Sequence, residues 1–142
     1  MALVWGLVLI ALSLLCWGGQ MIAWFAPHTA ERLALTESED TVEPAFYADV
    51  RGEALWDTFT LWVLLPAGVL LIADSEAWPY FGLIGASVYV YFAGRGILTR
   101  RALERRGLRI GSASGVKTAY VMLSVWGVAG LATIVAAAVA IS

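Results

Sequence analysis

Four long apolar segments dominate the pattern of hydrophobic and polar positions along the chain. They run from Leu3 to Ala26, from about Leu55 to Ala73, from about Trp78 to Leu98 and from about Val116 to Ile141. Each has about 19–26 residues, which matches a bilayer core of about 30 Å at 1.5 Å per helical residue. Because backbone groups in lipid need partners within their own segment, the pattern predicts four transmembrane helices.

Three polar connections separate these segments. Pro27 to Ala54 is long and acidic, Asp74 to Ala77 is a tight turn, and Thr99 to Gly115 is strongly basic. Since each span reverses direction, we expect the two long connections to share one side of the membrane. The short turn and both termini then share the other side.

The first connection has a pattern of its own and is predicted to form an amphipathic segment. We expect one or two helical turns over Thr29 to Leu35 and an irregular acidic stretch over Thr36 to Glu43. Pro44 suits the first turn of a helix that continues into the second span. Pro66 is expected to kink that span, because proline removes a helical hydrogen bond.

Further positions indicate how the helices end and pack. Gly107 is a candidate C-cap for the third helix. Small residues recur at helix-packing spacing in the last two spans, at Gly82, Ala86, Ala129, Thr133 and Ala137. We interpret them as contacts within one subunit, with a subunit–subunit interface as the alternative. Trp17, Trp62 and Trp126 are predicted to pack between helices, whereas other aromatic residues, including Trp56, Tyr91 and Phe92, are predicted near the interface.

Composition supports a membrane protein and excludes several function classes. Hydrophobic residues make up 61% of the chain and charged residues 14%, against roughly 45–50% and 25% in soluble domains. The 142 residues predict a single domain spanning 1–142, with the first span a retained helix and not a cleaved signal. The single Cys, Cys16, excludes an internal disulfide and a multi-Cys metal site, and the single His, His28, excludes a bis-histidine haem site within one subunit. We expect neither a metal nor a cofactor. A nucleic-acid partner is not expected, since the basic residues flank apolar spans.

The basic residues are distributed asymmetrically. All nine Lys and Arg residues lie in or beside the two long connections: Arg32, Arg51, Arg95, Arg100, Arg101, Arg105, Arg106, Arg109 and Lys117. The positive-inside rule predicts that both long connections are cytoplasmic and both termini extracytoplasmic. In a bacterium this would be the inner membrane.

A carboxylate stripe is the main candidate site. Asp49, Glu53 and Asp57 are spaced by four residues, so they lie on one face of a helix that enters the second span. Arg95 in the third span is expected at a depth similar to that of Asp57. Gln20 and His28, at the end of the first span, complete the candidate polar site. It is interpreted as an ion-pair network between helices or, alternatively, as an ion, proton or headgroup site.

The basic segment after the third span is a candidate lipid contact. Its five arginines are Arg100, Arg101, Arg105, Arg106 and Arg109. Each basic residue near an anionic membrane surface contributes about 1 kcal/mol to binding. A specific phosphorylated lipid or a partner protein is the alternative ligand for this segment.

Three functional hypotheses follow from these patterns. The first is a non-enzymatic oligomeric scaffold or accessory subunit of a membrane complex, with membrane lipids, further copies of itself or a larger complex as partners. The second is a small transporter or channel with a cytoplasmic-side Asp/Glu–Arg polar site. The third is a membrane-embedded enzyme acting on a lipid-like substrate, for which Glu53, Asp57 and His28 are the candidate acid–base groups.

Overall fold

A computed structural model describes residues 2–142 of the chain and has an all-α fold with four helices long and apolar enough to cross a membrane. The first span is α1 (Ala2–Phe25) and the second consists of α3 (Pro44–Thr60), the 3-10 turn η2 (Leu61–Val63) and α4 (Leu64–Ile72). The third and fourth spans are α5 (Trp78–Glu104) and α6 (Ala113–Ile141). The predicted four-helix membrane fold is confirmed.

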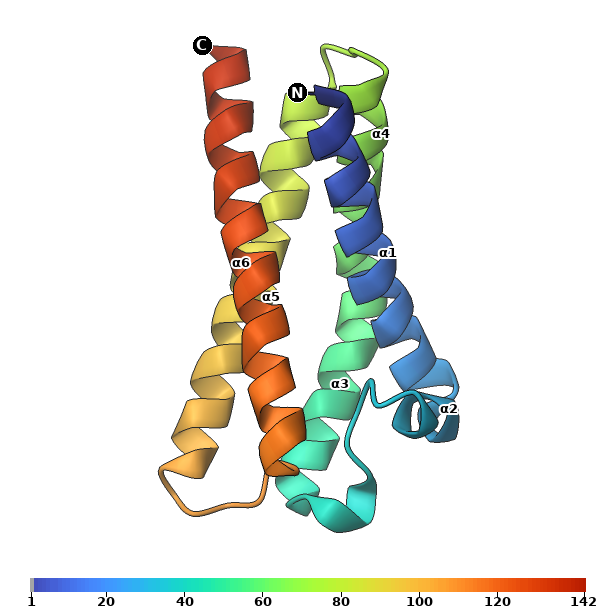
Figure 1. The fold of residues 1–142 in the computed structure, drawn as a ribbon, viewed down its shortest axis with the longest axis vertical. Helices are drawn as coiled ribbons and strands as arrows, with labels where there is room; N and C mark the ends of the chain where they lie inside the picture. Colours follow the sequence, from blue (N-terminus) through green and yellow to red (C-terminus); the bar gives the residue numbers. More distant parts are fainter. Residues whose placement is uncertain (1) are drawn as a thin grey trace.

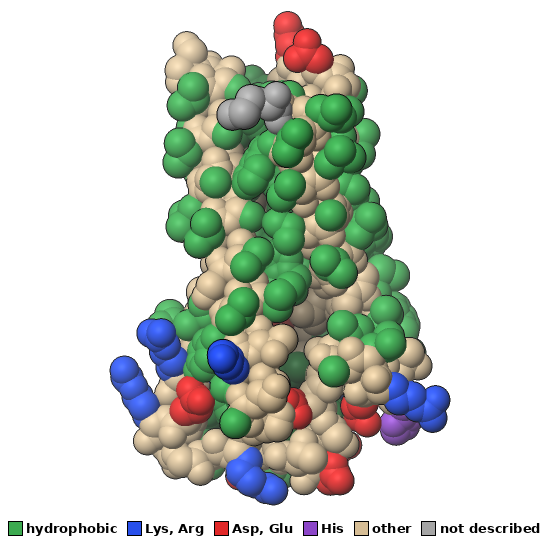
Figure 2. Space-filling view, viewed as in Figure 1, with side chains coloured by type: hydrophobic (Ala, Val, Ile, Leu, Met, Phe, Trp, Pro, Cys, Tyr) green, Lys and Arg blue, Asp and Glu red, His purple; other side chains and the backbone are tan. Residues whose placement is uncertain are grey.

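The four spans form an elongated bundle (Figure 1), and the Lys and Arg side chains visible in Figure 2 gather at one of its ends. Helix α5 packs along α6 and against α4, while α1 packs along α4 and α3. Both termini and the turn at residues 73–77 lie at one end, which we call the terminal end. The connections at residues 26–43 and 105–112 lie at the other, the loop end. The long connections therefore share an end, as predicted.

The first connection contains two short helical pieces before the second span begins. Helix α2 (Pro27–Arg32) and the 3-10 turn η1 (Glu39–Thr41) lie within it. The predicted helical turns are thus present, although they begin two residues before Thr29. Pro44 occupies the first turn of α3, where a missing N–H costs nothing. The helical part of the second span is therefore much longer than its apolar part.

Pro66 explains why the second span is interrupted. A proline cannot donate to the carbonyl four residues earlier, and its ring crowds that carbonyl. The residue four before Pro66 is Trp62, and the backbone tightens to the 3-10 turn η2 at Leu61–Val63. The predicted interruption is confirmed, and it lies on the N-terminal side of the proline because the lost partner is there.

The two long connections are packed together at the loop end. Val42, Phe46 and Ile110 form a small buried cluster, and the Glu43 amide donates to the Arg109 carbonyl at 2.8 Å. Helix α5 ends in the hydrogen-bond pattern typical of a glycine cap: the Gly107 amide donates to Glu104 and the next amide donates to Leu103. Gly107 has φ +70, which confirms the predicted C-cap.

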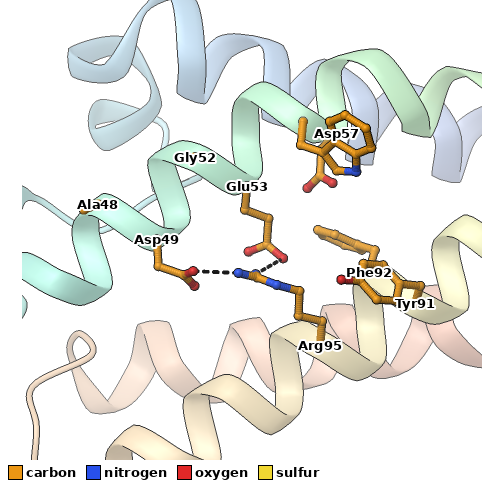
Figure 3. A pocket seen from close by; sticks show the side chains of 9 residues that line it. Ala48, Asp49, Gly52, Glu53, Asp57, Tyr91, Phe92 and Arg95 are labelled. Atoms are coloured by element: carbon orange, nitrogen blue, oxygen red, sulfur yellow. Dashed lines mark hydrogen bonds and ion pairs between the residues drawn. The ribbon is translucent and has the colours of Figure 1, made fainter.

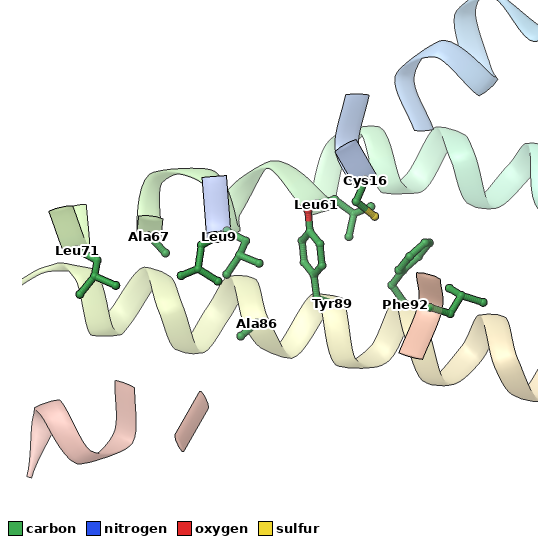
Figure 4. Packing of buried hydrophobic residues seen from close by; sticks show 10 residues of the cluster. Leu9, Cys16, Leu61, Ala67, Leu71, Ala86, Tyr89 and Phe92 are labelled. Carbon is green, nitrogen blue, oxygen red and sulfur yellow. The ribbon is translucent and has the colours of Figure 1, made fainter. Parts of the chain in front are cut away.

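The bundle core depends on close approach of helix backbones. Leu9, Leu61, Leu64 and Tyr89 are fully buried between α1, the second span and α5 (Figure 4). A Cβ added at Gly85 would lie 2.7 Å from the Leu64 backbone. This position on α5 must therefore be glycine for the second span to lie so close.

The small residues of the last two spans pack within this single chain. Ala86, Ala129, Thr133 and Ala137 are buried, and a Cβ on Gly82 would meet the Ala137 Cβ at 3.4 Å. The intramolecular interpretation is confirmed for these residues, since α5 and α6 use them to face each other.

Large apolar side chains cover the outside of the bundle (Figure 2), as expected for a surface in contact with lipid tails. Trp17 and Trp126 lie between helices as predicted: their indole nitrogens donate to the carbonyls of Thr58 (2.9 Å) and Leu12 (3.2 Å). The prediction for Trp62 was wrong. Its side chain, in the 3-10 turn η2, is exposed and donates to the Phe59 carbonyl of the same span.

Candidate functional site

Four of the predicted site residues meet between α3 and α5, toward the loop end. Asp49, Glu53 and Asp57 follow one face of α3, and Arg95 projects from α5 toward them (Figure 3). The four-residue spacing produces this alignment, because positions four apart lie on the same helix face. The structure thereby brings residues that lie about forty positions apart in the sequence to one cavity.

Arg95 binds the two outer carboxylates of this stripe. Its Nη2 donates to Asp49 Oδ1 at 2.6 Å, and its Nη1 lies 2.6 Å from Glu53 Oε1. The second contact is an ion pair without hydrogen-bond alignment. The Asp49 and Arg95 side chains are about one-third exposed, whereas the Glu53 side chain is only 11% exposed. The Arg95 guanidinium therefore links α5 to α3 through ion pairs with two carboxylates.

Asp57 lies one helical turn deeper and stands apart from these ion pairs. The residue is only 5% exposed, and its Oδ2 has no hydrogen-bond partner within residues 2–142. The sequence predicts Arg95 at a similar depth as its partner, but the guanidinium pairs with Asp49 and Glu53 instead. Burying a carboxylate without a partner is costly. No protein contact of this site therefore compensates the cost of burying Asp57.

The carboxylate stripe lines two adjoining cavities. The first, about 350 Å³, is lined by Asp49, Glu53, Asp57 and Arg95 together with Ala48, Gly52, Trp56, Tyr91 and Phe92. The second, about 320 Å³, is lined by Trp56, Asp57, Thr60, Ser87, Val88, Tyr91 and Phe92. Four residues belong to both, so the cavities form one groove along α3 and α5, which we call the α3–α5 groove. Trp56 and Tyr91 are each 64% exposed, which places the sides of the groove at the outer surface.

Two predicted site residues lie elsewhere. Gln20 lines neither cavity. The His28 side chain is 91% exposed and lies 4.0 Å from Glu31 on its own short helix. Helix α2 buries Ala30 in a cluster with Ala23 and Ala54, and this packing leaves the His28 side chain in solvent. Sequence spacing does not reveal which face of α2 is buried.

The five arginines of the basic segment have different environments. Arg100 turns inward: its Nη1 donates to the Gly96 carbonyl at 3.1 Å, and its guanidinium lies 5.4 Å from the centre of the Phe46 ring. Arg109 is 3.6 Å from Glu43. Arg101, Arg105, Arg106 and Arg109 are exposed. Only these four arginines have the exposure that a surface lipid contact needs.

Sequence reasoning missed two polar arrangements. Arg51 donates to the Ala23 and Trp24 carbonyls at the end of α1, where unpaired carbonyls and the helix dipole favour a cation. Inside the bundle, the buried Tyr89 hydroxyl lies beside Ser13 and Cys16. Ser13 and Cys16 lie three positions apart on α1, but no local signal links them to Tyr89.

The chemistry of the α3–α5 groove is that of binding by charge and by aromatic faces. In residues 2–142 no group of three His, Cys, Asp or Glu side chains is arranged to hold a metal ion. Comparison of the chain with protein-family models, curated proteins and solved structures finds no match.

Proposed function

We propose that this chain is a non-enzymatic accessory or scaffold subunit of a membrane complex, and that it binds a membrane amphiphile in the α3–α5 groove. One observation carries the proposal: the groove changes along its length from a charged region at Arg95 to an apolar region at Val88. An amphiphile with a polar head and an apolar tail has the same polarity gradient. The volumes of about 350 and 320 Å³ are within the common range for small-molecule sites.

The position of the groove supports access from lipid. Its sides carry Trp56 and Tyr91, which are largely exposed on the outside of the bundle. A ligand dissolved in the membrane then reaches Asp57 by lateral movement. Toward the terminal end, the fully buried Leu9, Leu61 and Leu64 fill the bundle interior.

We further propose that the loop end faces the cytoplasm. All nine Lys and Arg residues lie in the connections at that end or in the adjoining parts of α3, α5 and α6, and cytoplasmic segments carry an excess of these residues. Arg101, Arg105, Arg106 and Arg109 would then contact anionic headgroups of the inner leaflet.

A small transporter is the second candidate function. It is favoured by the buried polar side chains that continue inward from Asp57 to Cys16, Tyr89 and Ser13. For a transporter, Asp57→Asn should abolish substrate movement in vesicles. A scaffold that only binds its ligand should show no such movement in the unmodified protein.

The amphiphile proposal is tested by native mass spectrometry of protein extracted in a mild neutral detergent. We expect the unmodified protein to retain an amphiphile and Gly52→Phe to lose it. Gly52 lines the groove, and no atom lies within 4 Å of a Cβ placed there, so a phenylalanine side chain fits without a clash and takes up ligand space. Gly18→Phe is the matched control, since this α1 glycine also faces open space but lines neither cavity. Equal retention by both variants, or no retention by the unmodified protein, would contradict the proposal.

A further inference from the structure

We infer that the ligand of the α3–α5 groove carries a cationic ammonium head, held by Asp57 within an aromatic enclosure. This inference rests on the proposed function and adds the charge and class of the ligand. It starts from the four residues that line both cavities: Trp56, Asp57, Tyr91 and Phe92.

The charge of the groove favours a cation. Its lining contains three acidic side chains and one guanidinium, so acidic groups outnumber basic groups by two. Arg95 already contacts Asp49 and Glu53. The Asp57 carboxylate has an unpartnered oxygen and points into the space that Phe92 and Tyr91 border (Figure 3). A positively charged head at this position supplies the missing partner of a buried carboxylate.

The aromatic side chains favour an ammonium ion over other cations. Trp56, Tyr91 and Phe92 line the same cavity as the Asp57 carboxylate, and aromatic side chains around a site bind quaternary ammonium groups through the negative faces of their rings. Phe92 is also held in place from behind by an edge contact to Trp126, with ring centres 6.0 Å apart. A metal ion would instead need several oxygen, nitrogen or sulfur ligands, and no group of three His, Cys, Asp or Glu side chains in the described residues is arranged to hold one.

An anionic head lacks a free partner in the groove. Arg95 is shared between two carboxylates, and Arg100 is directed to the Gly96 carbonyl and the Phe46 ring. A phosphate or sulfate would therefore meet uncompensated carboxylates. The tail of a cationic ligand extends past Val88, Ser87 and Thr60 toward the lipid-facing surface.

The test compares three eight-carbon amphiphiles that differ in the charge of the head: octyltrimethylammonium, the neutral octyl ether of ethylene glycol, and octyl sulfate. Each is radiolabelled and measured by equilibrium dialysis against the protein in dodecyl maltoside, with protein-free micelles as the blank. We expect the ammonium compound to bind at least about tenfold more tightly than the neutral one, and octyl sulfate to bind most weakly.

Variants then assign this preference to residues. We expect Asp57→Asn to lower the affinity for octyltrimethylammonium about tenfold and to remove the preference over the neutral compound. Tyr91→Leu should weaken binding severalfold through loss of one aromatic face. Asp74→Asn and Phe59→Leu are the controls, because both positions are exposed and outside the groove, and both should bind like the unmodified protein. Thermal unfolding of each variant checks that it is folded.

Each other outcome has a defined meaning. Equal affinity for the charged and neutral compounds, abolished by Gly52→Phe, would overturn the ammonium inference and keep the amphiphile groove. Tighter binding of octyl sulfate would also overturn it. Binding of none of the three compounds would contradict both proposals. A preference that persists in Asp57→Asn would show that another group supplies the charge.

Discussion

Arg95 shows how one side chain holds two spans together. Its guanidinium lies 2.6 Å from an oxygen of Asp49 and 2.6 Å from an oxygen of Glu53, and it is the basic group nearest to both. Removing one partner from a buried ion pair costs about 3–5 kcal/mol. The cost should be smaller here, because two of the three side chains are about one-third exposed to solvent.

We therefore expect Arg95→Met to lower the free energy of unfolding by about 1–3 kcal/mol, since two carboxylates lose their partner. The triple variant Asp49→Asn, Glu53→Gln, Arg95→Met should recover most of this loss, because neither position 49 nor position 53 then carries a charge that has lost its partner. The measurement is denaturant unfolding in mixed micelles. If the single and triple variants are equally unstable, packing and not charge accounts for the role of Arg95.

At this scale the spacing of the carboxylates predicted their shared face, but not their partners. Asp49, Glu53 and Asp57 align because four residues make about one helical turn. Which of them meets Arg95 depends on the relative axial position of α3 and α5, and that is decided by packing at Gly85 and η2. The sequence predicts Trp56 and Tyr91 only as interface residues, because it does not show which side of a helix faces a cavity.

Among the elements, the contact between α5 and the second span depends on one glycine. A Cβ at Gly85 would be 2.7 Å from Leu64 Cα and from its amide nitrogen, atoms that cannot move without the helix. By contrast, nothing lies within 4 Å of a Cβ placed at Gly94 on the same helix. The two positions form a natural pair for comparison.

We expect Gly85→Ala to lower the free energy of unfolding by about 1–3 kcal/mol, as overpacking does in other cores. Gly94→Ala should be neutral or should stabilise the protein by up to about 1 kcal/mol, because alanine is the better helix residue. Thermal unfolding of the two variants in the same detergent compares them directly. A smaller loss for Gly85→Ala than for Gly94→Ala would show that the helices are less tightly packed than described.

For the whole molecule, the separation of the two ends carries a prediction about topology. The termini and the short turn share one end, and the basic connections share the other. With the loop end in the cytoplasm, a reporter active only outside the cytoplasm should be active when fused after Ser142. The same reporter inserted at the exposed Asp40 should be inactive. The reverse pair of results would show that the bundle is inserted with the opposite orientation.

The sequence by itself determined the number of spans, the shared end of the long connections, the cap at Gly107 and the interruption near Pro66. Each of these depends on local chemistry: apolar length, alternation of direction, a positive φ and a missing N–H. Only the tertiary structure decided that Arg95 serves Asp49 and Glu53, that Gln20 and His28 lie outside the groove, and that Asp57 is buried without a partner. These depend on the rotation and axial position of packed helices, which backbone contacts between distant residues fix. The packing of α3 against α5 thus determines which side chains meet in the site, and the sequence of either helix alone does not predict it.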